Sequence, residues 1–99
     1  MKQFLLLYHG PATPPGASHK GWPGWFKDIG DALVDIGSPM ENGFVVQSDG
    51  STSDNSSSLN GFSIIQAEDR VQALDLVKDH PFLAAGSEYM IEVFDVPKG

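Results

Sequence analysis

The feature that most constrains the fold is an unbroken apolar and aromatic segment near the start of the chain, Phe4 to His9. A strand with one wet face alternates apolar and polar residues, whereas a strand that is covered on both faces does not. Successive side chains of a strand point to opposite faces. Phe4, Leu6 and Tyr8 would therefore face one way, and the residues between them, with His9, the other. We expect a central strand with something packed against each face.

Two amphipathic helices are expected. The first covers Trp22 to Ile36, where aromatic and aliphatic residues recur at helical spacing and Gly37 supplies a natural C-terminal stop. The second begins after Asp69, which can cap it, and ends before Pro81. Both helices would carry one apolar face, so both should pack on a sheet.

Three further strands are expected, at residues 43–47, 62–67 and 89–96. Between the first two, residues 48–60 are rich in Ser, Asn, Asp and Gly and offer little to bury, which predicts a mobile loop with Asp49-Gly50 as a turn. The proline-rich stretch 10–21 is expected to be another loop. The elements thus follow the order strand, helix, strand, strand, helix, strand.

This order predicts an α+β fold of the ferredoxin-like βαββαβ kind, a four-stranded antiparallel sheet with both helices on one face. At 99 residues the chain is expected to form one domain, residues 1–99. No element is left to cover the other face of the sheet, where Leu5, Leu7, Met90 and Phe94 are candidates to lie. An uncovered apolar face is most often a partner site, which predicts a homodimer through the sheet face.

Composition excludes several classes of function. The formal net charge is −7 with a pI of about 4.5, which disfavours nucleic acid and anionic membranes as partners. Cysteine is absent, so disulfides, thiol nucleophiles and Cys-bound metals are excluded. The leading apolar run is too short for a signal peptide and no stretch could span a bilayer, so we expect a cytoplasmic protein.

Motifs for common cofactors and nucleophiles are not found. The three histidines lack metal-ligand spacing, so no metal site is expected. The sequence contains no P-loop, no dinucleotide fingerprint and no G-x-S-x-G, so nucleotide cofactors and acyl-transfer triads have no support from it, and no cofactor is expected.

His80 is the candidate catalytic residue, because histidine exchanges protons near neutral pH and His80 sits at the inward end of the second helix. The alternative is a structural histidine whose charge complements the helix C-terminus. Tyr8, His9 and Trp25 are candidates to line a substrate site, although each also fits a core or surface position. His9 and His19 flank the proline-rich loop and could approach each other.

The second half of the chain resembles the YCII-related family through Gly61-Phe62-Ser63-Ile64-Ile65-Gln66-Ala67, Ala73, His80-Pro81-Phe82 and Ile91-Glu92-Val93. The first half agrees more loosely, through the strand to Tyr8, the helix ending at Gly37 and Asp49-Gly50. The resemblance implies a small dimeric α+β barrel with a ferredoxin-like fold and a pocket between helices and sheet.

Two departures bear on chemistry. The DGPF branch carries Asp-Gly-Pro-Phe where this chain has Asp54-Asn55-Ser56-Ser57. Better-described members pair a histidine early in the first helix with the aspartate of Asp-Pro-Phe; here Trp25 or Phe26 stands for the histidine and His80 for the aspartate. The leading interpretation is a homodimer that binds a small organic molecule, with lyase- or isomerase-type proton transfer at His80. The alternatives are a non-catalytic binding or accessory module, and a purely structural dimer.

Overall fold

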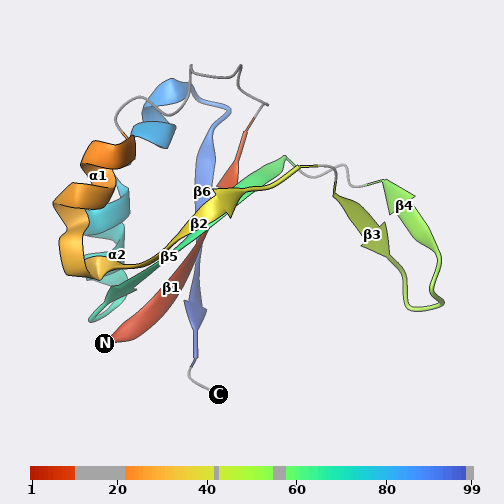
Figure 1. Cartoon of the computed structure of the whole chain (residues 1–99), viewed down its shortest axis with the longest axis horizontal. Helices are drawn as coiled ribbons and strands as arrows, with labels where there is room; N and C mark the ends of the chain where they lie inside the picture. Colours follow the sequence, from red (N-terminus) through yellow and green to blue (C-terminus); the bar gives the residue numbers. More distant parts are fainter. Residues whose placement is uncertain (11–21, 42, 55–57, 98–99) are drawn as a thin grey trace.

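The computed structural model describes residues 1–10, 22–41, 43–54 and 58–97 (Figure 1). Its elements are, in chain order, strand β1 (Lys2–His9), helix α1 (Trp22–Ile29), the short 3-10 helix η1 (Gly30–Ala32), strands β2 (Leu33–Pro39), β3 (Phe44–Val46), β4 (Thr52–Asp54) and β5 (Leu59–Ala67), helix α2 (Arg70–Val77), the 3-10 helix η2 (Pro81–Ala85) and strand β6 (Met90–Val96). Most of the loop predicted over 10–21 lies outside the described residues, namely 11–21 with His19. Residues 55–57 also lie outside them.

Four strands form an antiparallel sheet in the order β2-β5-β1-β6, with β1 at the centre next to β5 and β6. Figure 1 shows α1 and α2 at the same end of this sheet. The antiparallel sheet with two covering helices confirms the predicted ferredoxin-like α+β fold, and β1 is the central strand that its unbroken apolar sequence predicts.

The core lies between the sheet and the helices. Phe4, Leu6 and Tyr8 of β1 are at most 2% exposed, as expected from their shared face. They join one buried cluster with Trp25 of α1 and Val77 of α2, so both helices cover the same face of the sheet. The second helix begins as predicted, because the Asp69 side chain accepts a hydrogen bond from the backbone N–H of Gln72 at 2.9 Å.

The first helix is shorter than predicted. It ends at Ile29, and residues Leu33–Pro39 form the edge strand β2 instead of the last turns of the helix. Gly30, with φ of +55°, takes the backbone out of the helix, and Leu33 then pairs with Ile65 of β5. Short apolar patterns fit both periods, and here pairing with β5 decides the outcome.

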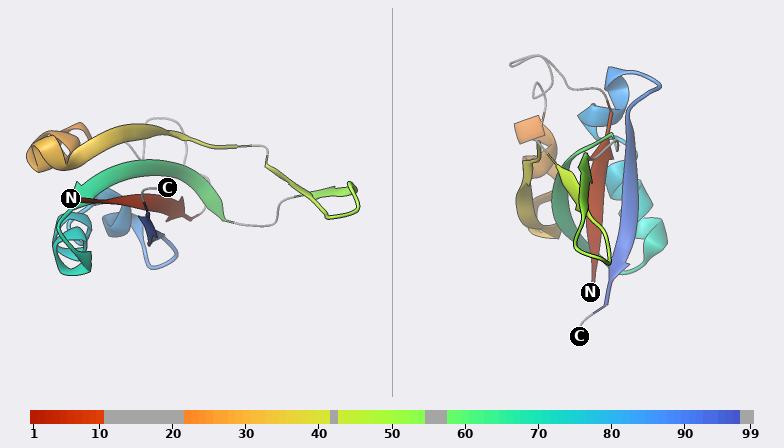
Figure 2. Two further views of the ribbon diagram at one scale, coloured as in Figure 1. Left: turned by 90° about the horizontal axis from the view of Figure 1, so that it is seen from below. Right: turned by 90° about the vertical axis from the view of Figure 1, so that its right-hand side faces the viewer.

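The second predicted strand, at 43–47, lies outside the main sheet. Phe44–Val46 pairs with Thr52–Asp54 in a separate two-stranded hairpin that projects from the body of the protein, seen edge-on in Figure 2. The prediction of a loop over 48–60 is therefore wrong for strand β4, and also for Leu59 and Asn60, with which β5 begins. The Asp49-Gly50 turn is confirmed: Gly50 has φ of +88°, and hydrogen bonds from Ser51 hold the pKa of the Asp49 carboxyl below its usual range.

Within the described parts of the chain, no helix has the length and apolar character needed to cross a membrane.

Candidate functional site

The sheet face opposite the helices is largely apolar and is not covered by any described element. Cross-strand pairing places Leu5 opposite Phe94 and Ile64, and Leu7 opposite Phe62, on this face. We call these residues, together with Met90, the open face: Leu5, Leu7, Phe62, Ile64, Met90 and Phe94. Phe94 is 49% exposed and Met90 51%, whereas the other four side chains are half-buried. The four residues predicted for the uncovered face are therefore confirmed there.

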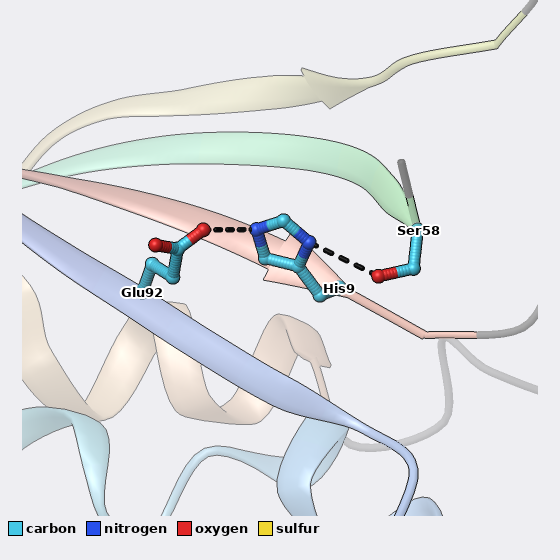
Figure 3. A network of polar contacts seen from close by, with 3 residues as sticks. All are labelled: His9, Ser58 and Glu92. Atoms are coloured by element: carbon cyan, nitrogen blue, oxygen red, sulfur yellow. Dashed lines mark hydrogen bonds and ion pairs between the residues drawn. The ribbon is translucent and has the colours of Figure 1, made fainter. Parts of the chain in front are cut away.

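One polar cluster interrupts the open face at the end of β1 (Figure 3). His9 and Glu92 project to this face, since Met90 pairs with His9 and Leu7 with Glu92. His9 Nε2 contacts Glu92 Oε1, a contact that is an ion pair when the ring is protonated, and His9 Nδ1 lies 3.1 Å from Ser58 Oγ. The ring is 9% exposed, while the Glu92 side chain is 44% exposed. The buried Nε2 has no hydrogen-bond partner among the described residues, so its interaction with this carboxylate is electrostatic.

These partners determine which ring nitrogen carries the hydrogen in neutral His9. An ionised carboxylate carries no hydrogen, so its contact with Nε2 favours the tautomer of the neutral ring that has its hydrogen on Nε2, although the two atoms do not form a hydrogen bond. Nδ1 then presents its lone pair to the Ser58 hydroxyl. A base whose orientation is fixed by a carboxylate is thus in contact with a hydroxyl group, which is an arrangement suited to proton transfer.

His80 lies on the opposite face of the sheet, in the core, and is 1% exposed. It is the residue before η2, and its Nδ1 accepts a hydrogen bond from the backbone N–H of Phe82 at 3.0 Å. In the neutral ring Nε2 therefore carries the hydrogen, which points to the Tyr8 hydroxyl at 3.2 Å. Sequence reasoning placed His80 at the end of α2, but its side chain caps the 3-10 helix that follows.

The contacts of His80 continue as a directed chain of hydrogen bonds. The Tyr8 hydroxyl donates to Ser63 Oγ at 2.8 Å, and Ser63 donates to the carbonyl oxygen of Ile36 at 2.7 Å. Burial lowers the pKa of His80 to about 4 and raises that of Tyr8 to about 12, the latter against the opposing effect of the Ser63 hydrogen bond. Both groups are neutral at physiological pH, and the chain links β1, β5 and β2 beneath the open face.

Aromatic rings surround the His80 imidazole. Its centroid lies 4.1 Å from that of Trp25 and 5.1 Å from that of Tyr8. The Trp25 indole N–H donates to the backbone carbonyl of Leu76 at 3.0 Å, which ties α1 to α2. Trp25 and Phe26 both lie near His80, so the residues that the family resemblance predicts in place of a His/Asp pair are close in space. Their correspondence to that pair stays a prediction.

The sheet therefore separates the predicted site residues into two groups. Tyr8, Trp25 and His80 meet on the helix-covered face, and His9 lies on the other face. Ser58 and Glu92 were not predicted as site residues; the only available signal was the alternation of β6, which puts Glu92 on an apolar face. The catalytic role of His80 stays a prediction. Both of its ring nitrogens contact groups within the protein, so proton exchange with a ligand there requires these contacts to rearrange.

Metal ligation has no visible basis in the parts of the chain that the structure describes, because no three His, Asp or Glu side chains gather there.

Comparison with known proteins gives one family and one fold. No curated protein matches the sequence. Among solved structures, a 5-chloro-2-hydroxyhydroquinone dehydrochlorinase (TftG) from Burkholderia phenoliruptrix, in complex with 2,5-dihydroxybenzoquinone, has the same fold with a TM-score of 0.56. The two share 17% sequence identity over 98% of this chain and 95% of that one. The family model for the YCII-related domain matches residues 17–96, so the chain belongs to the YCII-related family.

Proposed function

We propose that this YCII-related protein is a homodimer that binds a small planar organic molecule beside the sheet and exchanges a proton with it through His9. The observation that carries the proposal is the His9–Glu92 pair, an oriented imidazole on an otherwise apolar sheet face. Ligand sites are mostly apolar with a few fixed polar groups, and the open face has this composition.

The chemistry of the pair is general acid–base catalysis. Neutral His9 takes a proton at Nδ1 from an enol or phenol hydroxyl of the ligand. This hydroxyl contacts Nδ1 either in place of the Ser58 hydroxyl or beside it. Glu92 holds the ring in orientation and neutralises the positive charge that the ring acquires. Returning that proton to a neighbouring carbon or leaving group completes a lyase- or isomerase-type reaction.

The dimer is proposed from the open face. Leu5, Ile64 and Phe94 lie toward the middle of the strands, whereas His9 lies at the end of β1. A second copy packed on the apolar middle would bury it and leave the His9 end beside the contact as a site. Stable interfaces bury on the order of 1,200–2,000 Å² in total.

The class of ligand is suggested by the structural neighbour, whose bound 2,5-dihydroxybenzoquinone carries hydroxyl and carbonyl groups on a flat ring. A ring of this kind offers an acidic hydroxyl to His9 and a flat apolar surface to Leu7 and Phe62.

The test is a titration of the protein with 2,5-dihydroxybenzoquinone, followed by calorimetry in buffers of different ionisation enthalpy to count protons transferred. His9→Gln keeps an amide that can donate to Glu92 but cannot take up a proton, so it should abolish the proton transfer and weaken binding at least about tenfold. Glu92→Gln should weaken both ligand binding and proton transfer. Glu88 is an exposed carboxylate in the turn before β6, so Glu88→Gln is the control and should change neither binding nor proton transfer.

Two results separate the alternatives. Binding without proton transfer in the unaltered protein would favour a non-catalytic binding module. Loss of proton transfer in His80→Asn, with His9→Gln unaffected, would instead assign the chemistry to His80 as the sequence predicts. Equal behaviour of His9→Gln and the unaltered protein would refute the role of His9.

A further inference from the structure

The Ser58 hydroxyl completes a three-residue arrangement with His9 and Glu92 that the proton-transfer function does not require. Ser58 comes directly before β5, and its backbone carbonyl accepts a hydrogen bond from the Gly10 N–H at 3.0 Å. This bond fixes the Ser58 backbone beside the end of β1. The residue itself is exposed, so its hydroxyl is accessible to small molecules and to water.

The three side chains come from separate elements and meet in a line. Glu92 of β6 contacts Nε2 of His9, and Nδ1 of the same ring lies 3.1 Å from Ser58 Oγ (Figure 3). A hydroxyl, an imidazole in hydrogen-bond reach of it and a carboxylate that orients the imidazole together define an activated nucleophile. In the common serine hydrolase triad Nε2 faces the serine and Nδ1 the carboxylate, whereas here Nδ1 faces Ser58 and Nε2 faces Glu92. Such arrangements are recognised by their geometry rather than by a sequence motif.

We propose that Ser58 is a nucleophile toward activated carboxylic esters, a second activity that rests on the His9–Glu92 pair of the proposed function. Ser58 Oγ forms a bond to the ester carbonyl carbon while its proton passes to His9 Nδ1. The tetrahedral intermediate then expels the leaving-group oxygen, which takes that proton from His9, and the acyl group stays on Ser58. Water attacks the acyl-serine with His9 as base, releases the carboxylic acid and restores the hydroxyl.

The neighbouring donors set the expected rate. The Gly10 N–H is occupied by the Ser58 carbonyl, and the Asn60 side-chain amide donates to the Gly10 carbonyl at 3.2 Å. Neither group is directed at a developing oxyanion, and one missing oxyanion donor costs on the order of 10²–10³ in rate. Acylation is therefore slow, and a reactive ester is needed to observe it; a burst of one equivalent appears where hydrolysis of the acyl-serine is slower still.

The test is the reaction of the purified protein with p-nitrophenyl acetate, measured as p-nitrophenolate release and as acetyl transfer located by peptide mass spectrometry. The acetyl group is expected on Ser58. Ser58→Ala should abolish the labelled peptide and the burst, and His9→Gln should slow the burst by at least roughly 100-fold. Ser51→Ala is the matched control, because Ser51 has an exposed hydroxyl 2.6 Å from the Asp49 carboxylate and should leave the burst unchanged.

A thiol variant keeps the proposal falsifiable if the burst is too slow to follow. The chain contains no cysteine, so Ser58→Cys introduces a single thiol. His9 should increase its rate of alkylation by iodoacetamide well above that of Ser51→Cys, and His9→Gln should remove this difference. Equal alkylation rates at the two positions, or acetylation of another residue with Ser58→Ala unchanged, would overturn the nucleophile.

The proposed function can fail separately from this inference. Both the proposed function and the nucleophile are supported if Ser58→Ala loses acetylation but still binds 2,5-dihydroxybenzoquinone and takes up its proton. Unaltered protein that is not acetylated but shows His9-dependent proton transfer refutes the nucleophile alone. Acetylation of Ser58 without any ligand binding refutes the proposed function alone.

Discussion

The buried, neutral His80 should make the protein lose stability in mild acid. Its pKa falls from 6.5 in the unfolded chain to about 4 in the folded protein because burial disfavours the charged ring. Between these pH values the unfolded chain binds more protons than the folded one. The contribution to the free energy of unfolding is therefore fully present above pH 6.5 and is lost as pH falls toward 4.

The magnitude follows from the size of the pKa difference. A change from 6.5 to about 4 corresponds to roughly 3 kcal/mol, an upper figure for one group. Protonation would also place a hydrogen on Nδ1, where the Phe82 N–H donates in the neutral ring. His80 would then no longer cap η2, and a positive charge would lie in the core beside Trp25.

His80→Asn isolates this contribution. Asparagine does not titrate, and its side-chain oxygen can replace Nδ1 as the cap for η2. The variant should be less stable by roughly 2–4 kcal/mol above pH 6.5, since ring packing and the contact with Tyr8 are lost. Urea unfolding at fixed protein concentration, followed at neutral pH and near pH 4, measures the difference between the two proteins.

The difference should narrow by up to roughly 3 kcal/mol on acidification, because only the unaltered protein loses the His80 contribution. Carboxylates titrate in both proteins and cancel in the comparison. A difference that stays constant would refute the buried neutral ring. A difference that widens in acid would mean that His80 is charged and stabilises the end of α2, as the alternative sequence interpretation holds.

Two further predictions concern the sheet. Phe94→Asp, in the middle of the open face, should convert the proposed dimer to a monomer, as measured by light scattering. Val71→Asp, at a residue of α2 that is 67% exposed, is the control and should leave the dimer intact. An unchanged mass for Phe94→Asp would place the interface elsewhere. Gly37→Ala should cost more than about 3 kcal/mol in chemical unfolding, because Gly37 has φ of +78° and a Cβ would lie 1.7 Å from the Phe62 carbonyl oxygen. Gly24→Ala, in open space on α1, should be neutral or slightly stabilising, and similar stability of both alanine variants would contradict the tight approach of β2 to β5.

The central part of the fold was predictable because local and long-range signals agree there. The apolar run from Phe4 to Tyr8 predicts a central strand, and the structure places it in the middle of the sheet with Phe4, Leu6 and Tyr8 buried beneath the helices. Asp69 and Pro81 likewise bracket α2 by local chemistry alone. The signals for these elements lie within the segments themselves, so sequence patterns identify them.

The segment from Leu33 to Pro39 could not be assigned in this way. Its apolar residues fit both the helical and the strand period, and the choice depends on pairing with β5, which is distant in sequence. The irregularity between Asp35 and Ser38 turns the Ile36 carbonyl toward Ser63. Gly37 follows with φ of +78°, and a left-handed conformation of this kind has no signature in the sequence beyond the glycine itself.

The candidate site was the least predictable part, because its chemistry depends on which face each side chain occupies. Tyr8 and His9 are adjacent in sequence but belong to opposite faces of β1, so one lies in the core with His80 and the other on the open face with Glu92. Sequence reasoning judged histidines by their neighbours along the chain, whereas the partners of His9 come from residues 49 and 83 positions away. A polar residue on the same strand face as apolar residues, such as Glu92 between Met90 and Phe94 on the open face, is the signal that would have identified the pair. Strand alternation puts Glu92 and His9 on the same face of neighbouring strands, so a carboxylate in this position can contact a ring that lies 83 positions earlier in the chain.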